Sequence, residues 1–185
     1  MPTTGSPGSL LVLGLGNVLC GDDGLGVAAI EMLRRRYQIP AGVRVLDGGT
    51  LGLGLLSFIR PFDDVILVDA IEGAGPPGTF IRLEGDEVGP AVQTRLSCHQ
   101  IGVAELLDAL HMLNAYPRSL LLLGLVPETL ELGLGRSPPV EAQLPKLVEE
   151  IVAEARRFGY GLLRVDAPGN SSAEVRSPGV RALGL

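Results

Sequence analysis

Three side chains in this sequence have the types and positions to coordinate one metal ion. Asp23 follows a short apolar run and a glycine turn, Asp69 ends another apolar run, and His99 stands near the start of a helical segment. Two carboxylates and one imidazole, with coordination positions left for other ligands, suit a borderline divalent ion. The chemistry that these residues indicate is therefore divalent-metal coordination.

The position of His99 favours the neutral imidazole that a metal ligand requires. Ser97 and Gln100 have the spacing of a capping box, which predicts a helix that begins at Ser97 and runs to about Leu113. With Ser97 as the N-cap, His99 is the second helical residue. The positive end of the helix dipole disfavours the imidazolium form, so His99 is expected to stay neutral.

Strands separated by helices are expected to bring these residues to one edge of a sheet. Apolar runs predict strands at 10–13, 43–46, 65–68 and 119–126, and helical periodicity predicts helices from 24 to Pro40, at 51–59, at 97–113 and from Ser137 to Gly159. This alternation indicates an α/β fold, a single three-layer αβα domain over residues 9–162 with a mostly parallel, twisted, five-stranded sheet. Residues 79–83 alternate in polarity and are predicted to add one antiparallel strand. If the first and third strands are neighbours, Asp23 and Asp69 flank the crevice where such sheets bind ligands.

Segments outside these elements have weaker patterns. Residues 84–96 are polar and are predicted to be irregular. Pro145 is expected to kink the last helix or to delay its regular part, and Gly159 is expected to cap its end. Residues 1–8 and 163–185 are rich in small residues and proline and lack periodicity, so they are expected to be flexible termini.

Each candidate ligand also has a structural alternative. Asp22 or Asp23, placed before a helix, is more often an N-cap than a ligand. Asp69 can instead accept hydrogen bonds from loop amides, and a histidine in the first turn of a helix is usually structural or solvated. Of the remaining reactive residues, His111 lies on a polar helix face, and the two cysteines have no base fixed beside them.

Composition and charge exclude several classes of function. The net charge is −6, and no Lys/Arg cluster exists beyond Arg34–Arg36, so no nucleic-acid partner is expected. No secretion signal is visible at the start, and the apolar run Leu120–Val126 is too short to span a bilayer. Cys20 and Cys98 form no disulfide framework, which suits a reducing compartment. We therefore expect a soluble cytoplasmic protein with no membrane partner.

The glycine turn Gly14-Leu15-Gly16 invites comparison with nucleotide-binding motifs. The dinucleotide fingerprint requires a third glycine three residues after the second, and this sequence has Leu19 there. A nucleotide-dependent oxidoreductase is therefore the weaker interpretation.

Six segments, in one order along the chain, carry a resemblance to a known family. They are GLGNVLCGDDGLGV at 14–27, VLDGGT at 45–50, ILVDAI at 66–71, PGTF at 77–80, SCHQIG at 97–102 and LLGLVPETLELGLGRSPPVEA at 122–142. Together they resemble the nickel-iron hydrogenase maturation proteases over about residues 10–160. In that family an acidic residue after the first strand, an Asp ending the third and a later His bind metal. The resemblance assigns these roles to Asp23, Asp69 and His99, although some members have Glu at the first position.

The resemblance implies an endopeptidase that removes a C-terminal extension from the precursor of the hydrogenase large subunit. Its metal is the nickel already inserted in that precursor, and other divalent ions such as cadmium or zinc are expected to be able to occupy the site. Either the metal activates the carbonyl or water, or a free carboxylate acts as the base. Asp47 is a candidate to assist, with a turn-forming role before Gly48-Gly49 as the alternative. A nickel-sensing chaperone that binds the precursor without cutting it is the alternative function.

Overall fold

The strands form one mixed sheet. The computed structural model describes the backbone of residues 8–93 and 98–165 and the side chains of residues 8–92 and 103–165. Within this part, five strands pair in the order β3-β1-β4-β6-β5, with bounds β1 (Leu10–Leu15), β3 (Val43–Gly49), β4 (Asp64–Ala70), β5 (Phe80–Glu84) and β6 (Ser119–Leu125). The first four are parallel, and β5 is antiparallel to β6. The predicted mostly parallel sheet with one antiparallel strand is confirmed.

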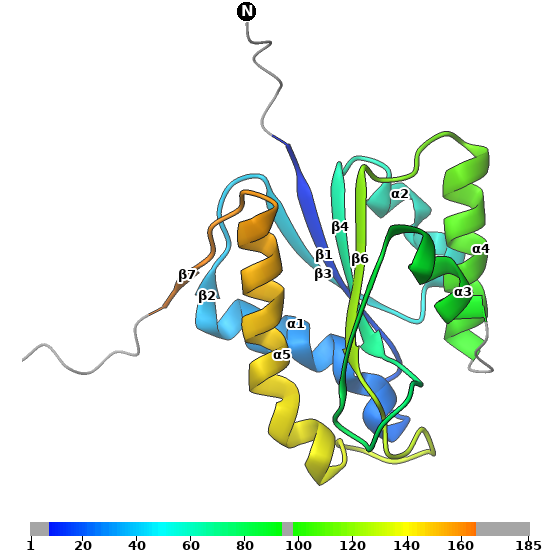
Figure 1. Ribbon diagram of the computed structural model, residues 1–185, viewed down its shortest axis with the longest axis vertical. Helices are drawn as coiled ribbons and strands as arrows, with labels where there is room; N and C mark the ends of the chain where they lie inside the picture. Colours follow the sequence, from blue (N-terminus) through cyan, green and yellow to red (C-terminus); the bar gives the residue numbers. More distant parts are fainter. Residues whose placement is uncertain (1–7, 94–97, 166–185) are drawn as a thin grey trace, which may run out of the picture.

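Helices cover both faces of this sheet (Figure 1). One face is covered by α1 (Leu25–Arg36) and α5 (Pro138–Arg157), and the other by α2 (Leu56–Ile59), α3 (Val88–Gln93) and α4 (Cys98–Met112). Single 3-10 turns, η1 (Gly21–Gly24), η2 (Gly52–Leu55) and η3 (Gly85–Glu87), precede α1, α2 and α3. The predicted three-layer αβα architecture is confirmed. No helix in the described residues is both long and apolar enough to cross a membrane.

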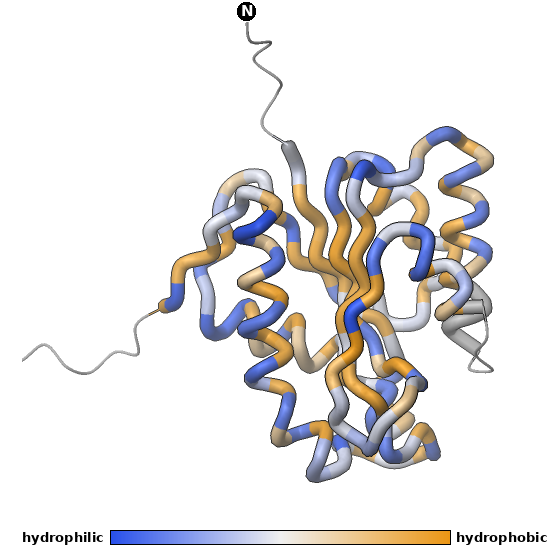
Figure 2. Tube along the Cα trace, viewed as in Figure 1, coloured by the Kyte–Doolittle hydropathy of each residue, from blue (hydrophilic) through white to orange (hydrophobic). Residues whose placement is uncertain are grey.

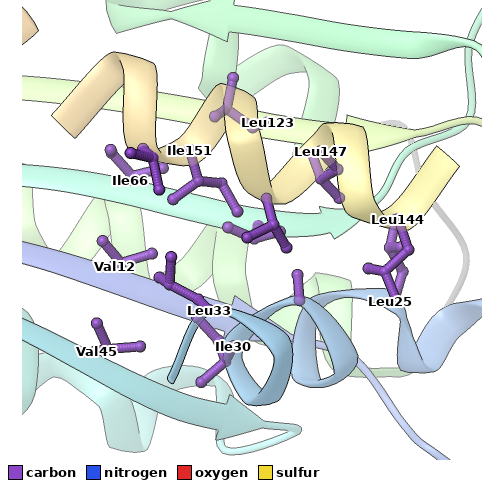
Figure 3. Packing of buried hydrophobic residues seen from close by; sticks show 14 of the residues in the cluster. Val12, Leu25, Ile30, Leu33, Val45, Ile66, Leu123, Leu144, Leu147 and Ile151 are labelled. Carbon is purple, nitrogen blue, oxygen red and sulfur yellow. The ribbon is translucent and has the colours of Figure 1, made fainter. Parts of the chain in front are cut away.

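The central strands are apolar along their whole length because both of their faces are buried. In β1, Leu10 and Val12 belong to the core under α1 and α5, whereas Leu11 and Leu13 belong to the core under α4. Figure 2 shows the resulting apolar centre, and Figure 3 shows side chains of α1, α5 and the strands packed in one layer. The hydrophobic pattern of the strands is thus enough to predict the layers.

The strand order reverses between β1 and β4. From β1 the chain passes through α1 to β3 on one side, and then crosses to β4 on the other side of β1. The connections therefore diverge beyond the carboxyl ends of β1 and β4, which is the position where α/β sheets commonly bind ligands. The predicted neighbourhood of the first and third strands is confirmed.

Residues 85–93 are not irregular as predicted. They form η3 and α3, and Glu84 with Glu87 makes a capping box at the start of η3. The backbone N–H of Glu84 donates to Oε2 of Glu87 at 3.2 Å. The sequence prediction was wrong because Glu is an uncommon N-cap, so this box lacks the usual Ser or Thr. Residues 94–96 lie outside the described part.

The last helix begins without the predicted delay. α5 is regular from Pro138 and contains Pro145 within its 20 residues. Its apolar face packs on the sheet on both sides of Pro145, through Leu144 and Leu147. This packing outweighs the one backbone hydrogen bond that a proline removes.

The predicted cap at the end of α5 is confirmed. The N–H of Gly159 donates to the carbonyl of Arg156 at 3.0 Å, and the N–H of Tyr160 donates to the carbonyl of Ala155 at 2.9 Å. These two bonds are those of a Schellman motif, which satisfies the last carbonyls of a helix.

A second, two-stranded sheet joins α1 to the end of the described chain. β7 (Leu163–Arg164) pairs antiparallel with β2 (Tyr37–Gln38), so regular structure continues two residues past the predicted boundary at 162. Residues 1–7 and 166–185 lie outside the described residues, and their flexibility stays a prediction.

We expect removal of residues 166–185 to change the melting temperature by less than about 2 °C, because this segment has no apolar periodicity to bury. Calorimetry of the chain ending at Val165 checks this. A fall of several degrees would show that the segment packs on the body. A chain ending at Gly161, which lacks β7 as well, serves as the comparison.

Candidate active site

Asp23 lies in η1, the turn that connects β1 to α1. Its side chain is buried, and its Oδ2 accepts a hydrogen bond from the backbone N–H of Asn17 at 2.8 Å. α1 begins after Gly24, which is its N-cap and has no side chain with which to cap it. The capping alternative for Asp22 and Asp23 is therefore wrong, because the 3-10 turn places one more residue between the acid pair and the helix.

Two glycines hold this turn against the ends of β1 and β4. A Cβ at Gly26 would overlap the carbonyl oxygens of Leu15 and Val68, so glycine is needed where α1 approaches both strands. Gly16, with φ of +115°, likewise passes against the carbonyl of Asp23. Asp23 is thus placed beside the end of β4, where Asp69 follows Val68.

The Gly26→Ala variant is expected to lose about 1–3 kcal/mol of unfolding free energy, because the added methyl group must push α1 away from two strand ends. Urea denaturation checks this. The Gly89→Ala variant is a matched control, since nothing lies within 4 Å of a Cβ at that helical position. Equal stability of the two variants would contradict the close approach.

Asp69 is the sixth residue of β4 and lies opposite Gly124 of β6. The carboxylate is buried, and its Oδ1 accepts a hydrogen bond from the N–H of Ala70 at 2.8 Å. This contact fits the alternative in which Asp69 only bonds local amides. It is also compatible with metal binding, because a carboxylate has two oxygens with several lone-pair positions.

His99 is the second residue of α4, as predicted. α4 leads directly into β6, and Figure 1 shows its N-terminal end at the same end of the molecule as the carboxyl ends of the parallel strands. The side chain of His99 and the proposed cap Ser97 lie outside the described part. The fold therefore places the start of α4 at the end of the molecule where Asp23 and Asp69 lie.

Metal coordination by these three residues stays a prediction. Among the side chains of residues 8–92 and 103–165, no three His, Cys, Asp or Glu groups form a metal site by themselves. The predicted site has His99 as its third member, and that side chain is not in this set.

Asp47 is the fifth residue of the edge strand β3, where it pairs in register with Gly14 of β1. The side chain is exposed, and its Oδ1 accepts a hydrogen bond from the N–H of Gly49 at 2.9 Å. This bond is the one that the turn-forming alternative requires. A catalytic role for Asp47 is untested.

Asp22 has a role that the sequence analysis missed. It is fully buried, and its two oxygens accept four hydrogen bonds from residues far along the chain. Oδ2 accepts from the N–H groups of Glu128 at 2.8 Å and Thr129 at 3.2 Å, and both oxygens accept from Ser137. Asp22 thereby ties the β6–α5 loop, residues 126–137, to the turn that holds Asp23. The acidic pair at 22–23 was visible in the sequence, but the partners of Asp22 were not.

The backbone strengthens this attachment. The N–H of Gly21 donates to the carbonyl of Gly133, and the N–H of Gly133 donates to the carbonyl of Leu19, each at 2.9 Å. The N–H of Asp22 donates to the carbonyl of Thr129 at 3.0 Å. The β6–α5 loop therefore forms a border beside the turn that holds Asp23.

Open grooves run along this border. One, of about 520 Å³, is lined by residues 72–73, just beyond β4, and 126–130. Another, of about 360 Å³, shares Glu128 and Thr129 with it and continues along the loop to Ser137. The groove beyond β4 starts three residues after Asp69, so an extended peptide can lie beside the candidate site.

His111 and Cys20 are reactive residues for which the sequence analysis expects no catalytic role. His111 is exposed and stacks on the ring of Tyr116, with ring centroids 3.9 Å apart. Cys20 is half-buried, and its backbone bridges to Gly133. That neither takes part in the chemistry stays a prediction.

Comparisons with known proteins point to one family. A family described as hydrogenase maturation protease matches residues 27–154. The Hydrogenase 2 maturation protease of Escherichia coli K12 is 40% identical over 151 residues, which cover 81% of this chain and 92% of that protein. The hydrogenase expression/formation protein HoxM of Azotobacter vinelandii is 39% identical over 178 residues, covering 95% and 84% of the two chains.

Solved structures agree with these sequence matches. The hydrogenase maturating endopeptidase HybD from Escherichia coli superposes with a TM-score of 0.81 at 38% identity, over 84% of this chain and 97% of that one. The nickel-iron hydrogenase maturation protease HybD from Thermococcus kodakarensis superposes with a TM-score of 0.65 at 27% identity, over 80% and 99%.

Proposed function

The chain belongs to the hydrogenase maturation protease family and is a protease, and from this premise we propose that it removes the C-terminal extension of the nickel-loaded precursor of a nickel-iron hydrogenase large subunit. The observation that supports this most strongly is the placement of Asp23 and Asp69, two buried carboxylates, at the carboxyl ends of the neighbouring strands β1 and β4. We place the reaction in the cytoplasm, in keeping with two cysteines that form no disulfide framework.

Nickel is part of the substrate in this proposal. Asp23, Asp69 and His99 would bind the ion that the precursor already holds, with the remaining coordination positions filled by the precursor. Two carboxylates and an imidazole match the preferences of such an ion, and a cation offsets the cost of keeping two carboxylates out of water. A precursor without nickel would lack this contact, so binding would also test whether the nickel has been inserted.

The cleavage itself requires a water molecule beside the scissile carbonyl. Either the nickel of the substrate polarises this carbonyl or the water, or a carboxylate of the site accepts the proton of the water as a general base. The groove lined by residues 72–73 and 126–130 would hold the extension in an extended conformation next to Asp69. The alternative of a chaperone that does not cut is disfavoured, because the similar proteins of Escherichia coli are named a maturation protease and a maturating endopeptidase.

Co-expression tests the proposed cleavage. The precursor of each large subunit of the source organism is produced with and without this protein, and the intact mass of the product is measured. We expect one large subunit to lose a short C-terminal peptide only when the protein is present. Unchanged masses for every precursor would refute the proposal.

We expect the protein alone to bind divalent ions weakly, because its three ligands are completed by the precursor. Cadmium, zinc or nickel at high concentration should still occupy the site, at about 2.0–2.3 Å from the N and O donors for a zinc-sized ion. Crystals soaked in these ions check this, with the His99→Ala variant as the control that loses the ion. An ion bound elsewhere, with the donors of Asp23, Asp69 and His99 separated by more than about 8 Å, would contradict the site.

A further inference from the structure

We propose that the β6–α5 loop docks the folded body of the large-subunit precursor through two exposed leucines, Leu132 and Leu134. The inference rests on the proposed function, which makes this precursor the substrate. It adds a contact outside the metal site and outside the cleaved extension, and so determines which protein is recognised.

The two leucines are unusually exposed. Leu132 is 90% and Leu134 is 84% accessible to solvent, and exposed apolar residues that group into one patch mark interaction sites. Two more exposed apolar residues, Val18 and Leu19, follow β1. The N–H of Gly133 donates a hydrogen bond to the carbonyl of Leu19, so the segment that holds Val18 and Leu19 lies beside the segment that holds Leu132 and Leu134. We call these four residues the docking surface.

The loop that holds these leucines is already ordered. Asp22 accepts hydrogen bonds from Glu128 and Thr129 before the leucines and from Ser137 after them. The backbone bridge at Gly133 fixes the position between the two leucines. A loop ordered before binding loses little conformational entropy in a complex, which is a property of efficient docking sites.

The docking surface is continuous with the candidate active site. Asp22, which anchors the loop, directly precedes Asp23, and the grooves beside the loop begin next to β4. A precursor that places its nickel between Asp23 and Asp69 must therefore lie against this border.

The charge around the docking surface favours a different protein over a second copy. Glu128 and Glu131 lie in the loop itself, while the guanidinium of Arg136 is paired with Glu141 at 2.7 Å. Two copies joined through this surface would bring their acidic rims together, and each chain has a net charge of −6. The surface fits an apolar patch with basic residues around it on the precursor.

A double variant tests the docking. In Leu132→Ser with Leu134→Ser, both changes are at exposed positions, so the melting temperature is expected to stay unchanged. We expect the Kd and the KM for the nickel-loaded precursor to rise about tenfold or more, with kcat at saturating precursor unchanged. Met112→Ser with Leu113→Ser is the matched control. These residues are exposed at the other end of α4 from His99, and both constants should stay at their original values.

Three results would separate the two proposals. If the original protein cleaves and the double variant has the same Kd and KM, the docking inference is wrong and the proposed function stands. If the original protein does not cleave, the proposed function is wrong, and the Kd comparison alone decides the docking. If sedimentation shows dimers that the double variant abolishes while precursor affinity is unchanged, the surface joins two copies and the inference is overturned.

Discussion

The Asp69→Asn variant is expected to fold like the original protein and to leave the nickel-loaded precursor uncut. The amide is almost isosteric with the carboxylate, and its oxygen can still accept the hydrogen bond from Ala70. As a neutral group, it is a much weaker ligand for a divalent ion. We expect the cleavage rate to fall by at least about a thousandfold, which corresponds to several kcal/mol of lost stabilisation. The rate is measured from the intact mass of the large subunit over time.

Asp64→Asn is a matched control in the same strand. Asp64 is also a buried carboxylate, but it lies at the other end of β4, where it accepts hydrogen bonds from Arg118 at 2.6 Å and Tyr160 at 3.2 Å. Burial, together with the charge of Asp64, raises the pKa of Tyr160 above its ordinary value, and the protonated hydroxyl donates to Asp64. This variant should lose stability and keep its cleavage rate. A cleaving Asp69→Asn variant would mean that Asp69 only bonds the amide.

His99→Ala is expected to have the same effect on cleavage as Asp69→Asn. Packing demands near the first turn of a helix are small, so the cost in stability should be low. A variant that still cuts would remove His99 from the site.

Substitutions of the adjacent residues Asp22 and Asp23 are expected to have opposite effects on stability and on cleavage. Asp22→Ala leaves four donors without their acceptor, two of them the amides of the exposed residues Glu128 and Thr129 and two of them groups of the buried Ser137. Because hydrogen bonds to a charged acceptor are among the stronger ones, we expect a loss of about 3–5 kcal/mol of unfolding free energy. For a chain of this length, that lowers the melting temperature by roughly 10 °C or more. Urea denaturation and calorimetry measure both quantities.

Asp23→Ser should give the opposite pattern. The hydroxyl can still accept a hydrogen bond from the N–H of Asn17, so we expect a stability change within about 1 kcal/mol. Serine is a poor ligand for a divalent ion, and cleavage should be lost. A different result would reverse the roles of these two residues. In that result Asp23→Ser still cleaves the precursor, whereas Asp22→Ala folds stably but does not cleave it.

Much of the fold follows from local sequence patterns. β1 and β4 are apolar because helices cover both faces of the sheet, and such runs can be recognised without knowing which helices those are. The edge strand β5 was found from its alternation. α3 was missed because its start depends on a Glu84–Glu87 box that lacks the usual Ser or Thr.

Some residues of the candidate site could likewise be predicted from local sequence, whereas others depend on contacts between distant parts of the chain. Asp23 and Asp69 could be placed together because each stands at the carboxyl end of a parallel strand. The carboxyl ends of neighbouring parallel strands meet at one edge of the sheet. The partners of Asp22 lie 106 to 115 residues away, and no local pattern reports a contact at that separation. The docking leucines depend on the same long-range contact, so they looked like ordinary loop residues in the sequence.

Cleavage of two forms of one precursor tests the central claim most directly. The large-subunit precursor is prepared with and without nickel, each form is incubated with the purified protein, and the intact mass of the product is recorded. The account predicts that only the nickel-loaded form is shortened, by a single C-terminal peptide. Equal shortening of the nickel-free form would contradict the claim that the protein recognises its substrate through the inserted metal.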